Sequence, residues 1–304
     1  MKKFAAEGVL LFITLIWGAT FVIIKTALQD LSPMLFVTIR FTLASLIFLP
    51  FLKKILKELN KATLAGGLVL GLFYFLGFST QTAGLQYTSA TKSAFITGSF
   101  VIFIPFWQVI IEKKIPGKGS VLGIVLVVLG LLFLSSKGKS LLEVFYELGS
   151  DFNIGDFLTI LCALFYAAYI VYLDSISKKH SYLPLVFIQI GLTGILGALT
   201  LVFFSVAGIE KIKFTFNEYI IFAFLYTSIL ATVLASTLQT KFQKFTTPSK
   251  AGIIISFEPI FSSVFAYLIL HETISFFGFI GCILIFTGLL ASELLSTQNE
   301  QLSG

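Results

Sequence analysis

The chain has 304 residues, of which 57% are hydrophobic and only 12% are charged. This composition excludes an ordinary soluble domain and predicts several membrane spans with no large soluble part. The net charge of +6 comes from lysines in short connectors, a pattern that membrane topology explains better than nucleic-acid binding. The two cysteines, Cys162 and Cys282, lie in apolar runs and have no spacing typical of a disulfide or a metal site.

Ten apolar segments are long enough to cross a bilayer as helices, which takes roughly 20 mostly apolar residues each. The first contains Trp17 and Lys25 and lacks a small-residue cleavage site, so we interpret it as an uncleaved span. The longest connector, residues 137–154, predicts an amphipathic turn at the membrane interface. In chain order the predicted spans are Gly8–Ile24, Met34–Leu52, Leu64–Thr80, Ala94–Ile111, Ser120–Ser135, Phe157–Leu173, Leu183–Val206, Tyr219–Leu238, Ala251–Leu270 and Ile274–Ser292.

The lysines of the connectors predict the orientation. With ten spans and the N-terminus inside, the lysine-rich connectors all fall on the cytoplasmic side. The outer loops then carry only Lys137, Lys139, Lys211 and Lys213. The chain is therefore predicted to be a multi-pass protein of the cell (inner) membrane with both termini cytoplasmic.

The two halves of the chain resemble each other at a shift of 158 residues. Residues 88–96 align with residues 246–254, and the same shift pairs Gln81 with Gln239. Each half holds five predicted spans, an odd number, so the second half enters the membrane from the opposite side. The predicted fold is an all-α integral membrane protein of ten transmembrane helices in two inverted five-helix repeats. The predicted units are a first repeat at 5–136, a loop at 137–154, a second repeat at 155–293 and a cytoplasmic tail at 294–304.

Inverted repeats of this kind are typical of secondary transporters, whose substrate site lies near mid-membrane between the halves. Two similar units of opposite orientation provide two conformations of similar energy, one open to each side. The alternative is gene duplication in a passive or structural membrane protein. Buried charge that coincides with the repeat favours the transporter.

Short motifs within the spans carry a family resemblance. They are Trp17-Gly18, Thr20-Phe21, Arg40-Phe41, Ser256-Phe257-Glu258-Pro259, His271-Glu272, Gly278, Gly281 and Gly288. In these residues, in the duplication and in the span count, the chain resembles the EamA-type drug/metabolite transporter family from about Gly8 to Glu293. The resemblance implies a ten-helix bundle around a central cavity that exports or exchanges small metabolites such as amino acids, often driven by an ion gradient.

The first half departs from this pattern. Phe100-Val101 stands where the second half has Glu258-Pro259, and Lys114 stands opposite Glu272. Glu258 therefore has no symmetric twin, and coupling through a carboxylate would be one-sided.

Glu258 is the first candidate site residue, because a carboxylate at membrane depth costs several kcal/mol unless it faces a partner or a wet cavity. Pro259 follows it and removes a backbone donor, which predicts a helix break beside the carboxylate. Glu258 is either a proton or substrate-amine site, or one half of a structural ion pair.

Three cations are further candidates for a substrate or coupling site. Arg40 lies about one third into its span and could hold an anionic group in a two-pronged contact or brace the first span. Lys250 lies two helical turns before Glu258 and could neutralise it, bind a substrate carboxylate, or reach the membrane surface. Lys92 is the repeat partner of Lys250 and carries the same alternatives.

Aromatic and amide side chains complete the predicted site, because metabolite cavities combine apolar walls with a few placed polar groups. Packing against neighbouring helices is the alternative role for each. The candidates are Trp17, Tyr74, Gln81, Tyr166, Tyr169 and Gln189.

The sequence predicts a secondary transporter that exports or exchanges an amino acid or related zwitterion by alternating access, with proton coupling as an open option. The alternatives are an uptake exchanger for a nucleotide-like or cofactor solute, an intramembrane enzyme, and a membrane scaffold or sensor that moves no solute. No nucleotide-binding loop, nucleophile elbow or metal-ligand pair is found, so no enzymatic activity and no cofactor are expected. The expected partners are a small-molecule substrate, the lipid bilayer and protons, without nucleic acid, for a monomer or homodimer.

Overall fold

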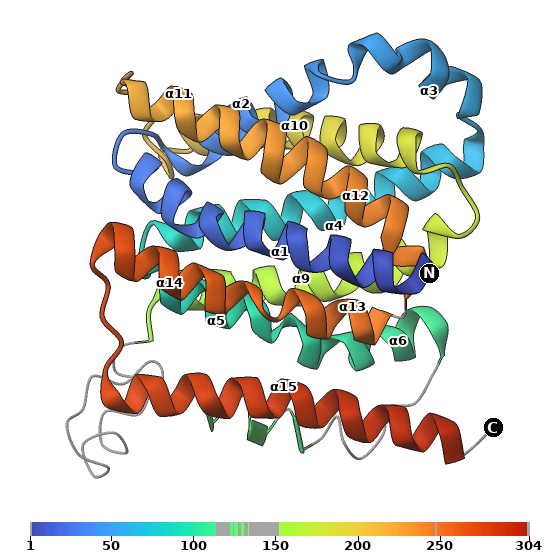
Figure 1. Cartoon of the computed structure of the whole chain (residues 1–304). Coiled ribbons are helices and arrows are strands. Elements are labelled where there is room, and N and C mark those ends of the chain that lie inside the picture. The colour runs from blue at the N-terminus through green and yellow to red at the C-terminus, as the bar shows by residue number, and fades with distance from the viewer. Residues whose placement is uncertain are drawn as a thin grey trace.

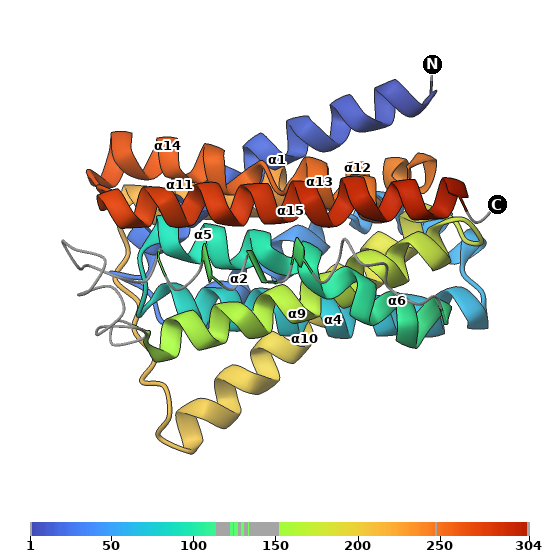
Figure 2. The same cartoon turned by 90° about the horizontal axis from the view of Figure 1, so that it is seen from below.

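A computed structural model describes residues 2–113, 152–246 and 248–302, together with a few isolated positions between 122 and 133. Among the described residues the regular secondary structure is helical, apart from one isolated bridge between Leu31 and Phe214. The helices pack side by side in a bundle, and α1 begins at the end of the bundle where α15 ends (Figures 1 and 2). In chain order they are α1 (Lys2–Ala27), α2 (Pro33–Leu46), η1 (Leu49–Phe51), α3 (Leu52–Glu58), α4 (Lys61–Leu85), α5 (Ala90–Gly98), η2 (Ser99–Phe103), α6 (Ile104–Glu112), α9 (Ile154–Ser177), α10 (Tyr182–Val206), α11 (Glu218–Leu225), η3 (Tyr226–Leu234), α12 (Ala235–Phe242), η4 (Gln243–Phe245), α13 (Pro248–Ile255), α14 (Glu258–Leu270) and α15 (Phe276–Leu302).

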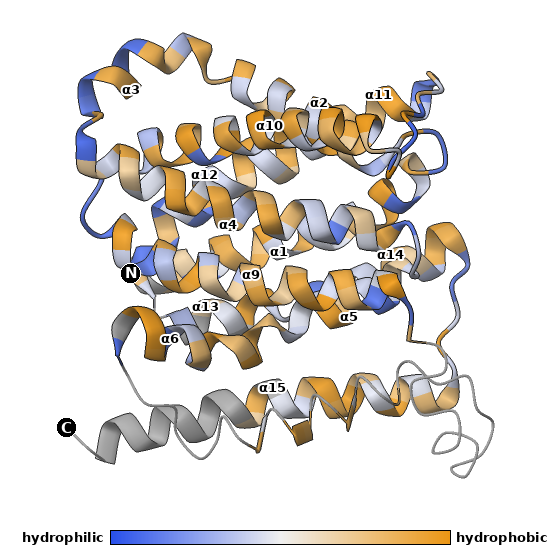
Figure 3. Cartoon of the chain, turned by 180° about the vertical axis from the view of Figure 1, so that it is seen from behind, coloured by the Kyte–Doolittle hydropathy of each residue, from blue (hydrophilic) through white to orange (hydrophobic). Residues whose placement is uncertain are grey.

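Six helical segments of the described part are long and apolar enough to cross a membrane, and a seventh results if the pair Pro33–Leu46 and Leu49–Glu58, bent by 40°, counts as one. Two shorter apolar helices, Glu258–Leu270 and Phe276–Gly288, follow near the C-terminus. Hydrophilic residues gather at the helix ends and turns (Figure 3). The chain is therefore a helical multi-pass membrane protein. The predicted span Ser120–Ser135 and loop 137–154 lie largely outside the described residues, so the count of ten stays a prediction.

Polar caps explain where several helices begin. The Asn60 side chain accepts a hydrogen bond from Thr63 N at 2.9 Å at the start of α4, and Asn217 does the same for α11. At the start of α9, Asn153 and Asp156 form a capping box, in which each side chain bonds the other residue's backbone N–H. Such caps satisfy backbone donors that have no partner in the first helical turn.

The helix interruptions recur at the 158-residue shift. α13 ends at Ile255 and α14 begins at Glu258, and the corresponding stretch of the first half passes from α5 through the 3₁₀ turn η2 into α6. Both broken helices end on a left-handed residue, Lys113 with φ 58° and His271 with φ 54°. These two positions are also 158 residues apart, so the internal similarity extends to local backbone geometry.

The segment η3, Tyr226–Leu234, is a π-helix between α11 and α12. A π-helix holds an extra residue within the helical register, and such segments often occur at functional sites. Here η3 presents polar groups to two predicted site residues. Its Ala231 carbonyl accepts from Trp17 Nε1 at 2.9 Å, and its Thr232 hydroxyl accepts from Arg40 Nε at 2.9 Å.

Candidate functional site

A cavity lies within the bundle, between α1, α4, α9 and α12. The η2 turn after α5 and the interruption between α13 and α14 also line it. The volume inside it that the centres of water molecules can occupy is about 40 Å³. A bound water takes about 10–15 Å³ of such space, so the cavity has room for about three waters and must widen to admit a metabolite. It is lined by Trp17, Thr20, Tyr74, Phe78, Gln81, Phe100, Tyr166, Tyr169, Ile170, Gln239, Ile255 and Glu258.

Glu258 is the single carboxylate among these lining residues. It is the first residue of α14, where the unpaired backbone N–H groups of a helix N-terminus favour a negative charge. The residue is 7% exposed. The helix break therefore delivers a carboxylate to the centre of the bundle and leaves it facing the cavity.

Two glycines bring neighbouring helices against this break. A Cβ atom on Gly18 of α1 would lie 2.6 Å from Phe261 Cβ and 3.2 Å from the Glu258 carbonyl oxygen. A Cβ atom on Gly98 of α5 would lie 2.6 Å from Pro259 Cγ. Both distances are too short for real atoms, so only glycine permits α1 and α5 to approach α14 so closely. Glu258 is thereby enclosed between α1 and α5.

Aromatic rings of α4 and α9 form another part of the cavity wall. The ring centroids of Tyr74 and Phe78 of α4 lie 4.6 Å apart. Tyr166 of α9 packs on Phe78 at 5.3 Å, and Tyr169 of α9 packs on Tyr74 at 5.2 Å. The Tyr74 hydroxyl shares a hydrogen bond with the Ser236 hydroxyl of α12. Such electron-rich faces attract cationic groups of ligands.

Arg40 stands behind this aromatic wall. Its side chain is 1% exposed, and its guanidinium carbon lies 4.7 Å from the Phe78 ring centroid and 5.1 Å from that of Phe41. Nε donates to Thr232, whereas the two terminal nitrogens have no hydrogen-bond partner within the described part of the chain. Unpaired buried donors of a charged group are costly, and two such donors of a guanidinium are the chemistry that binds an anion.

Buried amides lie on both sides of the cavity. Gln81 of α4 donates to Thr97 Oγ1 at 3.3 Å, and Gln239 of α12 donates to Gln243 Oε1 at 3.1 Å. Gln189 of α10 is fully buried, but it does not line the cavity, and both its amide atoms lack partners among the described residues.

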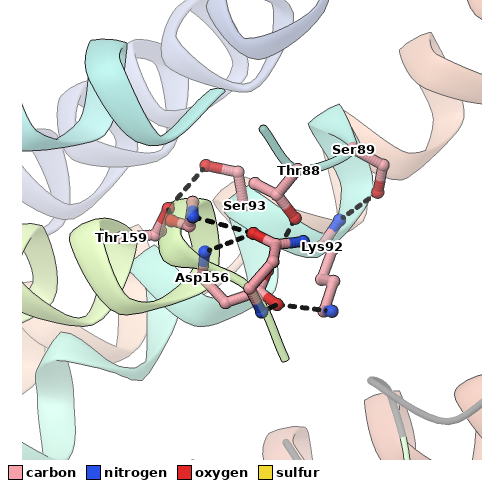
Figure 4. A network of polar contacts seen from close by, with 8 residues as sticks. Thr88, Ser89, Lys92, Ser93, Asp156 and Thr159 are labelled. Carbon is pink, nitrogen blue, oxygen red and sulfur yellow. Dashed lines mark hydrogen bonds and ion pairs between the residues drawn. The ribbon is translucent and has the colours of Figure 1, made fainter. Parts of the chain in front are cut away.

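Lys92 lies away from the cavity, in the first turn of α5. Its Nζ is 2.6 Å from Asp156 Oδ2, and the other Asp156 oxygen accepts from Thr88 Oγ1 at 2.7 Å (Figure 4). The pair ties α5 to α9 at the ends of these helices. The side chain of Lys250 lies outside the described residues, although its backbone is part of α13.

The structure thus gathers Trp17, Gln81, Tyr166 and Glu258 around one cavity. It places Arg40 and Gln189 in the buried layer around it and Lys92 at a helix end. Sequence reasoning missed Asp156, although the pattern Asn153-x-x-Asp156 before an apolar run is a readable capping signal. It did not select Gln239 either, which the repeat pairs with Gln81.

Among the residues that the structure describes, no three His, Cys, Asp or Glu side chains are grouped as a metal site would require. Fold and cavity define a polytopic helical membrane protein with one buried carboxylate in an aromatic chamber. Similarity to known proteins agrees with this class of membrane protein. Residues 6–136 and 153–293 each match the EamA-like transporter family, and the chain belongs to that family.

Similar proteins are transporters by name. An "Uncharacterized transporter" of Archaeoglobus fulgidus is 34% identical over 97% of this chain and 87% of its own length. "Uncharacterized transporter YoaV" of Bacillus subtilis is 24% identical over 91% of this chain and 92% of its own length. A solved crystal structure shares the fold with a TM-score of 0.67 at 15% identity, covering 97% of this chain and 99% of that chain. The family resemblance predicted from the sequence is confirmed, and the protein is a transporter.

Proposed function

We propose that the protein is a secondary transporter of the cell membrane that moves an amino acid or a related zwitterion. The observation that carries the proposal is the central cavity, with the Glu258 carboxylate on one side and the Arg40 guanidinium behind the aromatic wall. These two charges match the ammonium and carboxylate groups of a zwitterion.

The ammonium group of the solute would bind Glu258 and the rings beside it. Trp17 and Tyr166 line the same cavity, so a cation at Glu258 also meets aromatic faces. The carboxylate would reach Arg40 when the Phe78 ring turns aside, because the two terminal nitrogens of Arg40 are the fork that binds carboxylates bidentately. A nucleotide-like solute would need more cations than Arg40 supplies.

Alternating access would come from two inverted five-helix units, with ten spans and both termini cytoplasmic. The broken helices α5–α6 and α13–α14 meet at the cavity, as discontinuous helices do in transporters with inverted repeats. Opening toward either side would widen the small cavity. A proton and the ammonium group of the solute would compete for Glu258, so that solute leaving in one direction is exchanged for a proton moving in the other.

Uptake into proteoliposomes tests this proposal. Purified protein is challenged with a mixed pool of amino acids and cofactors, with and without a pH gradient, and lumenal solutes are identified by mass spectrometry against empty liposomes. We expect amino acids to be enriched in the lumen in a manner that depends on the pH gradient. In Glu258→Gln the enrichment should no longer depend on the gradient, and in Arg40→Met it should be abolished.

Glu218→Gln is the matched control, because it removes a carboxylate from the first turn of α11, away from the cavity lining. Glu258→Gln behaving like Glu218→Gln would rule out the coupling role. Wild-type affinity for the solute in Arg40→Met would rule out recognition of an anionic group, and no enrichment by folded protein would rule out this solute class.

A further inference from the structure

A line of buried polar side chains follows the contact between α5 and α9, which we call the α5–α9 seam. It begins at Asp156, which is 0% exposed, and continues through Ser93, Thr159 and Thr97, none more than 1% exposed. Buried polar chains within membrane proteins cost energy and mark paths for ions or protons.

Hydrogen bonds join the first part of the seam. Asp156 is held by Lys92 and by Thr88, and Lys92 is partly exposed, so this end of the seam reaches the surface of the bundle. One turn deeper, the Ser93 and Thr159 hydroxyl oxygens lie 3.5 Å apart and face each other across the two helices (Figure 4).

The next turn continues the seam toward the cavity. Thr97 stands four residues after Ser93, on the same face of α5. Its Oγ1 accepts from Gln81 Nε2 at 3.3 Å and lies 4.0 Å from Cys162 Sγ of α9. The polar atoms thus extend over two turns of α5, from the surface to the level of Gln81, which lines the cavity.

The seam ends beside Glu258. Gly98, the residue after Thr97, packs directly on Pro259, the residue after Glu258. Tyr166 of α9 lines the cavity together with Glu258, and Cys162 precedes it by one helical turn on the same face of α9. With Tyr169, these are the titratable groups that α9 presents toward the cavity. Tyr74 of α4 lines the same cavity, and the Arg40 guanidinium of α2 packs on Phe78 of its wall. Among the described residues, α1 and α5 present no charged group to the cavity.

The repeat-related contact between α13 and α1 has a different composition. The 158-residue shift pairs Ser93 with Ala251 and Thr97 with Ile255. Ala251 packs in one apolar cluster with Leu10 and Ile13 of α1, all 0% exposed. At Ala251 this contact is therefore apolar, and the buried Thr14 hydroxyl of α1 beside it bonds the Leu10 carbonyl of its own helix. The α5–α9 seam carries hydroxyls at the corresponding positions.

We propose that the α5–α9 seam is a proton path that connects Glu258 with the membrane face at which Lys92 lies. The proposal rests on the exchange of protons at Glu258 in the proposed function. Each hydroxyl accepts a proton on one lone pair and releases its own to the next group, and water bridges the gaps longer than a hydrogen bond. One proton enters from water at the Lys92–Asp156 end, and one passes from Thr97, directly or through one water, to the Glu258 carboxylate.

Trp17 provides a readout that needs no solute, because it lines the cavity together with Glu258. The chain has two tryptophans, so Trp107→Phe leaves Trp17 as the only indole. This variant is reconstituted in liposomes, its orientation is determined by protease cleavage of a terminal tag, and the pH is jumped on one face at a time. Glu258→Gln in the same background identifies the part of the fluorescence change that reports Glu258.

We expect the Glu258-dependent response to follow a jump on the Lys92 face about tenfold faster than a jump on the opposite face. Thr97→Val should slow the response from the Lys92 face by about tenfold, and Thr97→Ser should restore it. Thr80→Val is the matched control, because the Thr80 hydroxyl binds the Leu76 carbonyl of its own helix, outside the seam. Ser93→Ala provides a second test within the seam if Thr97→Val does not fold.

Each of three results would overturn the path. They are equal response rates from the two faces, a response of Thr97→Val as fast as that of Thr80→Val, and the absence of a Glu258-dependent response. Amino-acid exchange at equal pH on both sides separates this result from the proposed function, because it requires the cavity but no net proton movement. Thr97→Val should retain that exchange. A sided proton response without exchange of any amino acid would reject the proposed solute and keep the path.

Discussion

Gly18 packs so closely on α14 that one added methyl group there should displace the helix that begins with Glu258. A Cβ atom at Gly18 would lie 2.6 Å from Phe261 Cβ, 3.1 Å from Ser262 N and 3.2 Å from the Glu258 carbonyl oxygen. Carbon atoms pack at about 3.5–4.0 Å, so Gly18→Ala must push α14 away from α1 by about 1 Å. Two of the three atoms belong to the backbone, so rotation of a side chain cannot relieve the clash.

The expected cost follows from that displacement. Overpacking of a well-packed interior costs about 1–3 kcal/mol. Alanine in a helix gains about 1 kcal/mol over glycine, which leaves a net destabilisation of up to about 2 kcal/mol. The displaced segment carries Glu258, so solute uptake should fall even where the loss of stability leaves the protein folded.

Thermal melting of the purified protein and proteoliposome uptake measure the two effects. Gly8→Ala is the matched control, since Gly8 is in the same helix and a Cβ there has nothing within 4 Å. Gly18→Ala should melt a few degrees below Gly8→Ala and transport less. Equal melting temperatures and equal uptake in the two variants would refute the reasoning.

Three further predictions concern polar contacts around the bundle. Burial raises the pKa of Glu210, against the hydrogen bond that its carboxylate accepts from Met34 N. The contribution of Glu210 to stability is therefore present at low pH and is lost as pH rises through the raised pKa, and Glu210→Gln should remove that part of the decline in melting curves recorded at rising pH. Tyr74→Phe should cost about 1–2 kcal/mol by leaving the buried Ser236 hydroxyl without its partner, and the double variant with Ser236→Ala should cost less than the sum of the single changes in denaturation. Glu272→Gln should lower the melting temperature by a few degrees, because its two oxygens accept from the first two N–H groups of α5 and an amide has one acceptor oxygen; unchanged melting would contradict that role.

The helical, membrane-spanning class could be predicted from the sequence because hydropathy alone determines it. The interruption beside Glu258 was also predictable, since Pro259 removes a backbone donor inside an apolar run. The 3₁₀ turn in the first half is less evident, because there the proline comes later, at Pro105. The π-helical segment η3 contains no proline or glycine from which its position could be predicted.

The walls of the cavity could be predicted only in part. In a chain with 15% aromatic residues, rings that face lipid and rings that face a cavity have the same hydropathy. Phe78 and Phe100, which line the cavity, therefore did not stand out from Phe residues on the outer surface. The setting of Arg40 depends on Thr232, 192 residues away, and no local pattern reveals such a contact.

The π-helical segment η3 also affects which changes in length the chain can accept. In an α-helix each residue turns the chain by about 100°, so loss of one residue from the middle of α4 would rotate Gln81 out of the cavity. A π-helix already contains one residue more than the α-helical register needs. Deletion of a single residue within Tyr226–Leu234 would convert the segment to α-helix and leave Gln239 facing the cavity. Relatives that differ by one residue in this span can therefore keep the same chamber.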